Sequence, residues 1–226
     1  MDAAGHAFHS PLNISLHLTR LATQVGIQAI NTQGKHKKVR EARTAMVVAT
    51  FMYELTGDPF YVHLVKDDPP DAIVMGMPEE TPETLNLTKL EISTYRSGGR
   101  ETFLEQLKRT KAPLRHILDE KHILLYDVPD HTGIDFEACR DYLNKIGAPF
   151  PVWVQHISQT LPDTIASITF LNPTIWKKTV NVGNAAYELK QKNMPPVIFP
   201  KRVGTVDKVR LEPSRIYDYA PWEDLT

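Results

Sequence analysis

Three acidic side chains occupy positions where a carboxylate could do chemistry. Glu41 falls in the first turns of an expected helix, Asp71 begins a short expected strand, and Glu91 interrupts a longer one between Leu90 and Ile92. A charge inside an apolar strand is costly unless it is paired or bound to metal. Carboxylates that converge from adjacent strands repel each other, and a divalent cation removes that repulsion. Oxygen ligands suit Mg²⁺ or Mn²⁺, which activates water and stabilises charge on a phosphodiester.

Each of these acids also has an ordinary structural interpretation. Asp71 follows two prolines, and Asp favours turns through its side-chain hydrogen bonds. Glu41 stands four and three residues after Lys37 and Lys38, so it could pair with them on a helix surface. Glu91 could lie on an edge strand with one solvated face. The order in which the three acids occur favours the joint interpretation over the separate ones.

That order follows from the secondary structure that must position the acids. Apolar periodicity predicts a helix over 35–56, which Gly57 ends and Pro59 prevents from continuing. Breakers and apolar runs then predict strands over 60–66, 71–75 and 87–95, a helix over 101–110 and a strand over 122–128. The three acids therefore belong to the first helix, the second strand and the third strand of this segment.

The rest of the chain carries weaker patterns. Helices are predicted over 136–146 and 184–192, and strands over 152–157 and 165–171. Residues 10–31 fit a helix in part and a strand in part, and 31–34 are expected to form a loop. His6 and His9 are expected in a disordered tail rather than at a metal. The five prolines of 195–226 predict an extended arm.

The segment 34–41 that ends in Glu41, the pair Pro70-Asp71 and the triplet around Glu91, in this order of elements, resemble the restriction-endonuclease-like, PD-(D/E)XK nuclease superfamily. The resemblance covers about 35–128. It implies a mixed central sheet flanked by helices and metal-dependent cleavage of DNA. It also implies Asp71 and Glu91 as metal ligands, with Glu41 a ligand directly or through water.

One position departs from the family pattern. The family's lysine stands two residues after the second acid, and here Ser93 occupies that place. A serine carries no charge with which to activate water or balance the carboxylates. Lys89, on the same strand face as Glu91, could replace that lysine, as could Lys108 or Lys111 on the following helix. Otherwise the fold survives as a catalytically inactive binding scaffold.

Charge is distributed unevenly along a chain whose net charge is only −1. Residues 67–91 hold seven acidic side chains and one basic, between segments with an excess of Lys and Arg. Carboxylates that hold a cation beside a polyanion would give this pattern, and so would alternating solvated faces. On the first interpretation, the basic residues expected to contact nucleic-acid phosphates are Lys35, Lys37, Lys38, Arg40, Lys108 and Lys111.

Length and composition bound the class of protein. The 226 residues, 42% hydrophobic and 23% charged, are typical of a globular chain, and no apolar run is long enough to span a membrane. A single cysteine precludes an internal disulfide, so we expect a cytoplasmic protein. We predict one α/β (α+β) domain over 1–226: an αβββαβ core at 35–128, a further helix and strands at 129–194, and the arm at 195–226.

The function predicted from these observations is a divalent-metal-dependent nuclease that hydrolyses DNA, with Mg²⁺ or Mn²⁺ as its cofactor. The alternative is an inactive nuclease-fold protein that serves as a nucleic-acid-binding or structural component of a larger assembly. A third hypothesis is an unrelated α/β protein that binds a partner through its C-terminal arm. Many proteins of the resembled fold act as dimers, but no dimer surface can be identified from the sequence.

Overall fold

The structure is a computed structural model that describes residues 6–66, 70–78, 85–99, 101–114, 122–129, 131–159, 164–192, 194–203 and 208–213. The helices are α1 (Pro11–Val25), α2 (Ile27–Thr32), α3 (Lys37–Thr56), α4 (Phe103–Leu114), α5 (Phe136–Lys145) and α6 (Val182–Gln191), with a 3₁₀ turn at Gly34–His36. The strands are β1 (Phe8–His9), β2 (Phe60–Leu64), β3 (Ala72–Gly76), β4 (Asn86–Thr94), β5 (His122–Val128), β6 (Val152–Gln159), β7 (Ile165–Phe170), β8 (Trp176–Asn181), β9 (Val197–Val203) and β10 (Lys208–Pro213). The predicted succession of helix, three strands, helix and strand is therefore present as α3, β2, β3, β4, α4 and β5.

The ten described strands form one mixed sheet in the order β10-β9-β1-β2-β3-β4-β5-β6-β7-β8. β2, β3 and β4 are antiparallel neighbours, whereas β4, β5 and β6 run parallel. Parallel neighbours require a crossover connection, and α4 and α5 provide the two that are needed. The predicted α+β class with a mixed sheet flanked by helices is confirmed.

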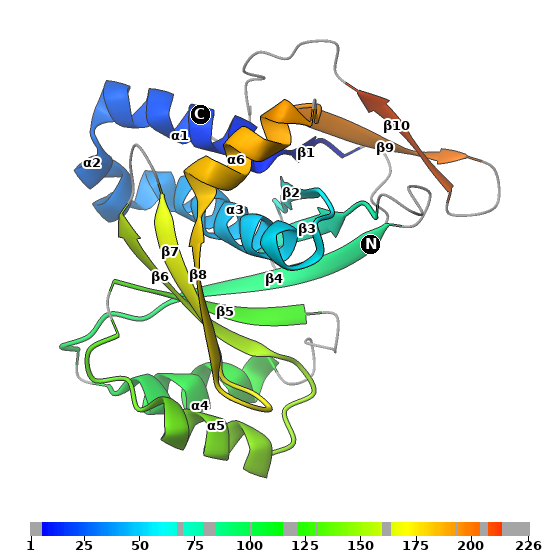
Figure 1. Cartoon of the computed structure of the whole chain (residues 1–226). Helices are drawn as coiled ribbons and strands as arrows, with labels where there is room; N and C mark the ends of the chain where they lie inside the picture. Colours follow the sequence, from blue (N-terminus) through cyan, green and yellow to red (C-terminus); the bar gives the residue numbers. More distant parts are fainter. Residues whose placement is uncertain are drawn as a thin grey trace.

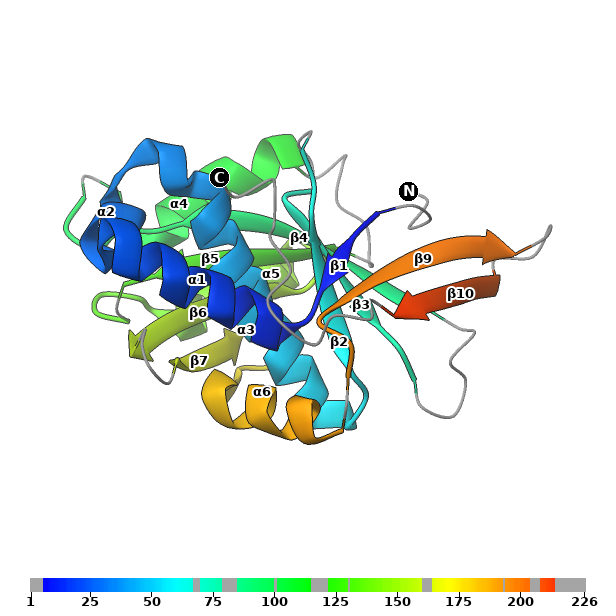
Figure 2. The ribbon, with the colours of Figure 1, turned by 90° about the horizontal axis from the view of Figure 1, so that it is seen from above.

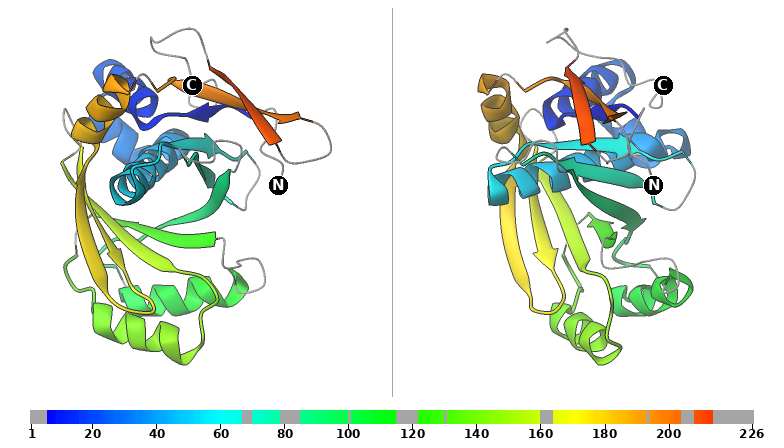
Figure 3. Two further views of the ribbon diagram at one scale, coloured as in Figure 1. Left: turned by 45° about the vertical axis from the view of Figure 1, so that its right-hand side comes forward. Right: turned by 90° about the vertical axis from the view of Figure 1, so that its right-hand side faces the viewer.

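Helices cover both faces of this sheet (Figures 1 and 3). α3 lies against one face, where it contacts β2 and β3, and α1 and α6 pack on it (Figure 2). α4 and α5 contact each other on the opposite face (Figure 3). No described helix has both the length and the hydrophobicity needed to cross a lipid bilayer.

Side-chain alternation along the central strands divides the core in two. On β5, Ile123 and Leu125 belong to the core beneath α3, whereas Leu124 and Tyr126 belong to the core beneath α4 and α5. A strand that is buried on both faces is expected at the centre of a sheet with helices on each side. On β4, Leu90 is fully buried on the α3 side.

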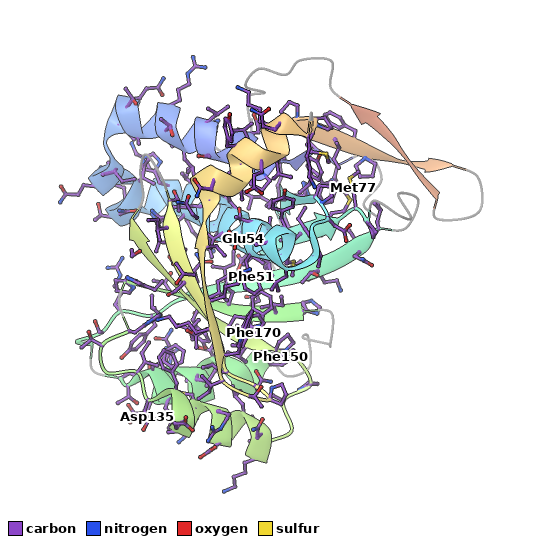
Figure 4. All side chains as sticks on the ribbon, viewed as in Figure 1. Phe51, Glu54, Met77, Asp135, Phe150 and Phe170 are labelled. Atoms are coloured by element: carbon purple, nitrogen blue, oxygen red, sulfur yellow. The ribbon has the colours of Figure 1, made fainter. Side chains whose placement is uncertain are left out.

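An aromatic cluster joins the C-terminal half of α3 to the last strands of the sheet. The ring centroids of Phe51 and Phe170, both labelled in Figure 4, lie 5.4 Å apart. Trp153 and Trp176 complete the cluster, with ring centroids 4.4 and 5.0 Å from Phe170. These ring contacts anchor the C-terminal half of α3 on the last strands of the sheet, because buried aromatic rings contribute large packing areas.

At the ends of the chain the structure decides one ambiguous segment and corrects two expectations. The ambiguous segment 10–31 is helical, and its start is fixed by Ser10, whose hydroxyl accepts a hydrogen bond from the backbone N–H of Asn13. The expected loop at 31–34 is divided between α2 and a 3₁₀ turn. His9 is buried in β1, and its Nδ1 lies 2.8 Å from the Asn13 amide nitrogen, so it does not belong to a disordered tail. The expected arm contains β9 and β10, and β9 pairs with β1.

Candidate active site

Asp71 lies immediately before the first residue of β3 and is buried. Its backbone N–H donates to the carbonyl of Leu90, and its Oδ2 accepts a 2.7 Å hydrogen bond from the backbone N–H of Ile92. The side chain thus satisfies a backbone donor of β4 just before β3 begins. This arrangement fixes one carboxylate oxygen, Oδ2, while the other, Oδ1, lies 3.9 Å from Lys37 Nζ.

Glu41 reaches the same region from α3. Its carboxylate is only 4% exposed, and two ammonium groups contact it: Lys37 Nζ lies 3.1 Å from Oε1 and Lys38 Nζ lies 2.9 Å from Oε2. Lys38 also donates a 3.0 Å hydrogen bond to the carbonyl of Val65, just after β2. The pairs with Lys37 and Lys38 that the sequence allowed do form, but Glu41 is buried against the sheet rather than exposed on the helix surface.

Lys37 connects the two acids. Its Nζ, 3.1 Å from Glu41 Oε1, is also 3.9 Å from Asp71 Oδ1. The two carboxylates therefore approach within about 7 Å of each other, with a cation between them. At this distance two like charges of low exposure repel strongly, and the ammonium offsets that repulsion.

The lysines stand at an electrostatically unusual place for cations. Lys37 and Lys38 begin α3, and its first turn contains no acidic residue. The N-terminus of a helix carries partial positive charge, which disfavours cations by about 0.3–1 kcal/mol each. Residues that go against such a local preference, here basic side chains at a helix N-terminus, are typical of functional positions. Glu41, one turn further along, supplies the compensating charge.

Glu91, Lys89 and Ser93 share the other face of β4. Leu90 and Ile92 face α3, so alternation places these three on the side of α4 and α5. Glu91 is half-buried and lies beside Leu124 of β5 in the parallel register. The β3–β4 register pairs Ala72 with Leu90, and one residue further it sets Asp71, just before β3, opposite Glu91. The structure thus joins Glu41 to Asp71 through Lys37 and sets Glu91 next to Asp71 along the sheet.

The donor set limits what a metal could use. Within the described residues, no group of three or more Asp, Glu, His or Cys side chains is arranged to hold a metal ion. Glu41 and Asp71 supply two carboxylates, and both Glu41 oxygens are buried without a hydrogen bond of normal geometry in the described part of the chain. Mg²⁺ typically takes one or two carboxylates together with waters and substrate phosphate. The two acids fit that mode, provided that the 59%-exposed Lys37 side chain moves aside.

The remaining predicted residues are spread over different surfaces. Lys35 is exposed in the 3₁₀ turn that precedes α3. The Arg40 guanidinium donates to the carbonyls of Ile30 and Gln33 at 2.8 Å, so it holds the turn between α2 and α3. Lys108 Nζ lies 5.5 Å over the Tyr142 ring, on the α4–α5 side of the sheet rather than beside Glu41. The side chain of Lys111 lies outside the described residues.

Sequence reasoning missed two features. Lys37 was considered only as a phosphate contact or a surface partner of Glu41, because its 3.9 Å approach to Asp71 depends on how α3 crosses β3. The other is Asp127, which lies 4.0 Å from the buried guanidinium of Arg43. Burial raises the pKa of Asp127, while the nearby Arg43 opposes that shift. An acid inside the apolar strand 122–128 was the available signal, of the same kind that identified Glu91.

Neither the protein-family models nor the curated proteins that were compared with this chain contain a match. Function is therefore argued from the geometry of the Glu41–Lys37–Asp71 cluster and from the order of the elements that carry it.

Proposed function

We propose that this protein is a divalent-metal-dependent nuclease that hydrolyses DNA phosphodiester bonds. The proposal takes α3, β2, β3, β4, α4 and β5 as a restriction-endonuclease-like αβββαβ core. Two features support that assignment. β2, β3 and β4 form an antiparallel meander, and α4 connects β4 to the parallel strand β5. The acids also stand where the resembled pattern has them, on α3, at the start of β3 and within β4.

The observation that carries the proposal is the position of Lys37. Its ammonium contacts Glu41 at 3.1 Å and Asp71 at 3.9 Å, so a cation is present between two acids of the site although Ser93 replaces the usual lysine. In this proposal Lys37 takes over the task of that lysine, instead of Lys89. Its exposed side chain can follow a phosphate that enters the site.

The residues of the cluster divide the chemistry as follows. Asp71 is oriented by the Ile92 N–H at Oδ2 and offers Oδ1 to a cation. Glu41 offers a second carboxylate. Glu91 is opposite Asp71 in the register of β3 and β4, but its side chain faces α4 and α5, so Asp71 and Glu41 are the two acids assigned to the metal. When bound by these acids, Mg²⁺ or Mn²⁺ supplies an activated water and offsets charge on the phosphodiester. Lys37 donates hydrogen bonds to the oxygen on which negative charge develops.

Cleavage of nucleic acid tests this proposal. Supercoiled plasmid, single-stranded DNA and RNA are incubated in Mg²⁺ or Mn²⁺ with wild type, Asp71→Asn, Glu41→Gln and Lys37→Met. Lys145→Met, an exposed substitution on α5, is the matched control. We expect metal-dependent cleavage of DNA by wild type and the control, and loss of at least about 100-fold in the three cluster variants. Wild type that cleaves no substrate in either metal would overturn the proposal.

One observation favours the non-catalytic alternative. Glu41 already has two ammonium partners, Lys37 and Lys38, so its charge is offset without a metal ion. A chain of this kind could serve as a nucleic-acid-binding component of an assembly. The two functions separate experimentally, because a scaffold would bind DNA in a salt-dependent manner, with and without Mg²⁺, and leave it intact.

A further inference from the structure

A second polar site lies at the carboxyl ends of the parallel strands β4 and β5. It is a cavity of about 950 Å³, called here the arginine pocket, and its polar lining includes Asn31, Arg40, Arg43, Thr94, Arg96 and Asp127. Small-molecule sites commonly measure about 300 to 1,000 Å³, and the carboxyl ends of parallel strands are where open α/β sheets bind ligands. The described lining of the pocket includes none of the residues considered for the proposed metal site, which are Lys37, Glu41, Asp71 and Glu91. The arginine pocket is therefore a separate site from the carboxylate cluster.

Arg43 is the buried element of the pocket. Its side chain is only 10% exposed, Nη1 donates a 2.8 Å hydrogen bond to Asn31 Oδ1, and Nη2 lies 4.0 Å from Asp127 Oδ2. Its Nε is buried without a hydrogen-bond partner among the described residues. A guanidinium offers five N–H donors, so Arg43 is held firmly and still has donors for a ligand. A buried cation held in this way is expensive to maintain for packing alone.

Two further arginines leave the pocket with an excess of positive charge. The Nη1 of Arg40 is fixed by backbone carbonyls of the α2–α3 turn, which preorganises its planar fork. Arg96, just past the end of β4, is exposed and makes no ion pair or hydrogen bond through its side chain within the described part of the chain. Of the acids that line the pocket, Glu101 is held by Arg109 and Asp127 by Arg43. The pocket therefore attracts an anion.

The guanidinium of arginine donates two parallel hydrogen bonds. It therefore fits the paired oxygens of a phosphate better than it fits a spherical anion. The cavity is also much larger than a single phosphate needs, and it contains an acceptor, Asp127, beside the donors. A ligand that carries a phosphate at one end and O–H or N–H donors at the other would use both.

We propose that the arginine pocket binds a nucleotide, with its phosphate on Arg40, Arg43 and Arg96 and a sugar or base donor on Asp127. The nucleotide could be free in solution or part of a nucleic-acid strand, since both present the same chemistry. The proposal uses none of the residues assigned to hydrolysis, so it stands or fails separately from the nuclease assignment.

Equilibrium binding in EDTA tests the proposal without any cleavage. The probes are inorganic phosphate, adenosine, adenosine 5′-monophosphate and a fluorescent single-stranded dodecanucleotide. The test variants are Arg96→Gln, which changes an exposed side chain and leaves the core intact, and Arg43→Lys, which keeps the charge but removes the fork. Arg140→Gln on α5 is the matched control. Thermal unfolding confirms that each variant is folded.

We expect the mononucleotide or the strand to bind wild type and Arg140→Gln equally well, and Arg96→Gln and Arg43→Lys at least about tenfold more weakly, as for loss of a charge-assisted hydrogen bond. Binding of the strand without the mononucleotide would support the proposal and assign the nucleotide to a nucleic acid. Binding of neither probe, or equal affinity in all variants, would overturn it. If the strand does not bind and adenosine 5′-monophosphate binds no more tightly than phosphate, the assignment of a nucleotide would be overturned.

Discussion

Lys37 and Lys38 contact the same carboxylate, yet their loss should have different consequences. Lys38 is 31% exposed, pairs with the buried Glu41 at 2.9 Å and also donates to the Val65 carbonyl at 3.0 Å. Removal of one partner of a buried ion pair costs about 3–5 kcal/mol, because the other charge is left without compensation. Lys37 remains near Glu41 in a Lys38→Met variant, so we expect about 2 kcal/mol of destabilisation, below that range.

Lys37→Met should behave differently. The Lys37 side chain is 59% exposed, and exposed ion pairs contribute at most about 1 kcal/mol. Lys38 would still compensate Glu41. We therefore expect Lys37→Met to lower the free energy of unfolding by less than about 1 kcal/mol, while it abolishes the proposed activity. One lysine serves mainly stability in this account, and its neighbour serves mainly chemistry.

A double-mutant cycle measures the coupling directly. Urea unfolding, followed by circular dichroism, gives the free energy of unfolding for wild type, Lys38→Met, Glu41→Gln and the double variant. Because the cost of Lys38→Met comes from the charge left on Glu41, the double variant should be at least about 1 kcal/mol more stable than the sum of the single changes predicts. Strict additivity, or equal losses in Lys37→Met and Lys38→Met, would refute the reasoning.

Three other predictions follow from packing and burial. A Cβ at Gly76 would lie 2.5 Å from the buried Phe60 ring, so Gly76→Ala should lower the free energy of unfolding in urea by about 1–3 kcal/mol. Adding Phe60→Leu to that variant should restore part of the lost stability. Burial raises the pKa of the Cys139 thiol to about 12. Iodoacetamide at pH 8 should therefore label this thiol only as fast as the protein unfolds. Rapid labelling under native conditions would contradict its burial. Burial raises the pKa of Asp127 in the folded state despite the nearby Arg43, so the native state binds a proton more readily than the unfolded state. Wild-type stability should therefore fall, relative to Asp127→Asn, as pH rises from the ordinary Asp range through that raised pKa, and a difference independent of pH would contradict it.

The central elements were predictable because local and global signals agree there. The apolar stripe of α3 ends at Gly57, whose φ of 80° suits glycine, and β5 is rich in Ile and Leu because it is buried on both faces. In such elements the spacing of apolar residues along the sequence follows directly from which side chains the core buries. The order α3, β2, β3, β4, α4, β5 could therefore be predicted without coordinates.

The sheet edges were not predictable in the same way. β8 is mostly exposed or part-buried, contains two lysines and has Val180 as its one buried residue, so its sequence resembles that of a loop. Pro200 and Pro213 argued against strands in the C-terminal segment, yet they lie in β9 and β10. Pro213 is in the edge strand, and Pro200 lies beyond the two residues of β9 that pair with β1. Proline is tolerated at such edge positions. β1 is only two residues long and is defined by its partners rather than by its own sequence.

The candidate site was predicted in part. Glu91 could be chosen because its charge interrupts an apolar strand, and Glu41 and Asp71 because they precede it in the order of elements that the resembled family has. The position of Lys37 between two of them could not be predicted, since it depends on where α3 crosses the start of β3. Arg43 and Asp127 come from an expected helix and an expected strand far apart in sequence, and only the folded sheet places their charges 4.0 Å apart.

The most direct test of the central claim is the rate of plasmid cleavage in Mn²⁺ by wild type, Lys37→Met and Lys145→Met at equal concentration, with EDTA as the blank. We expect EDTA-sensitive cleavage by wild type and Lys145→Met, and a rate lower by at least about 100-fold for folded Lys37→Met. Cleavage by Lys37→Met at the wild-type rate would contradict the role given to Lys37, and no cleavage by wild type would contradict the nuclease itself.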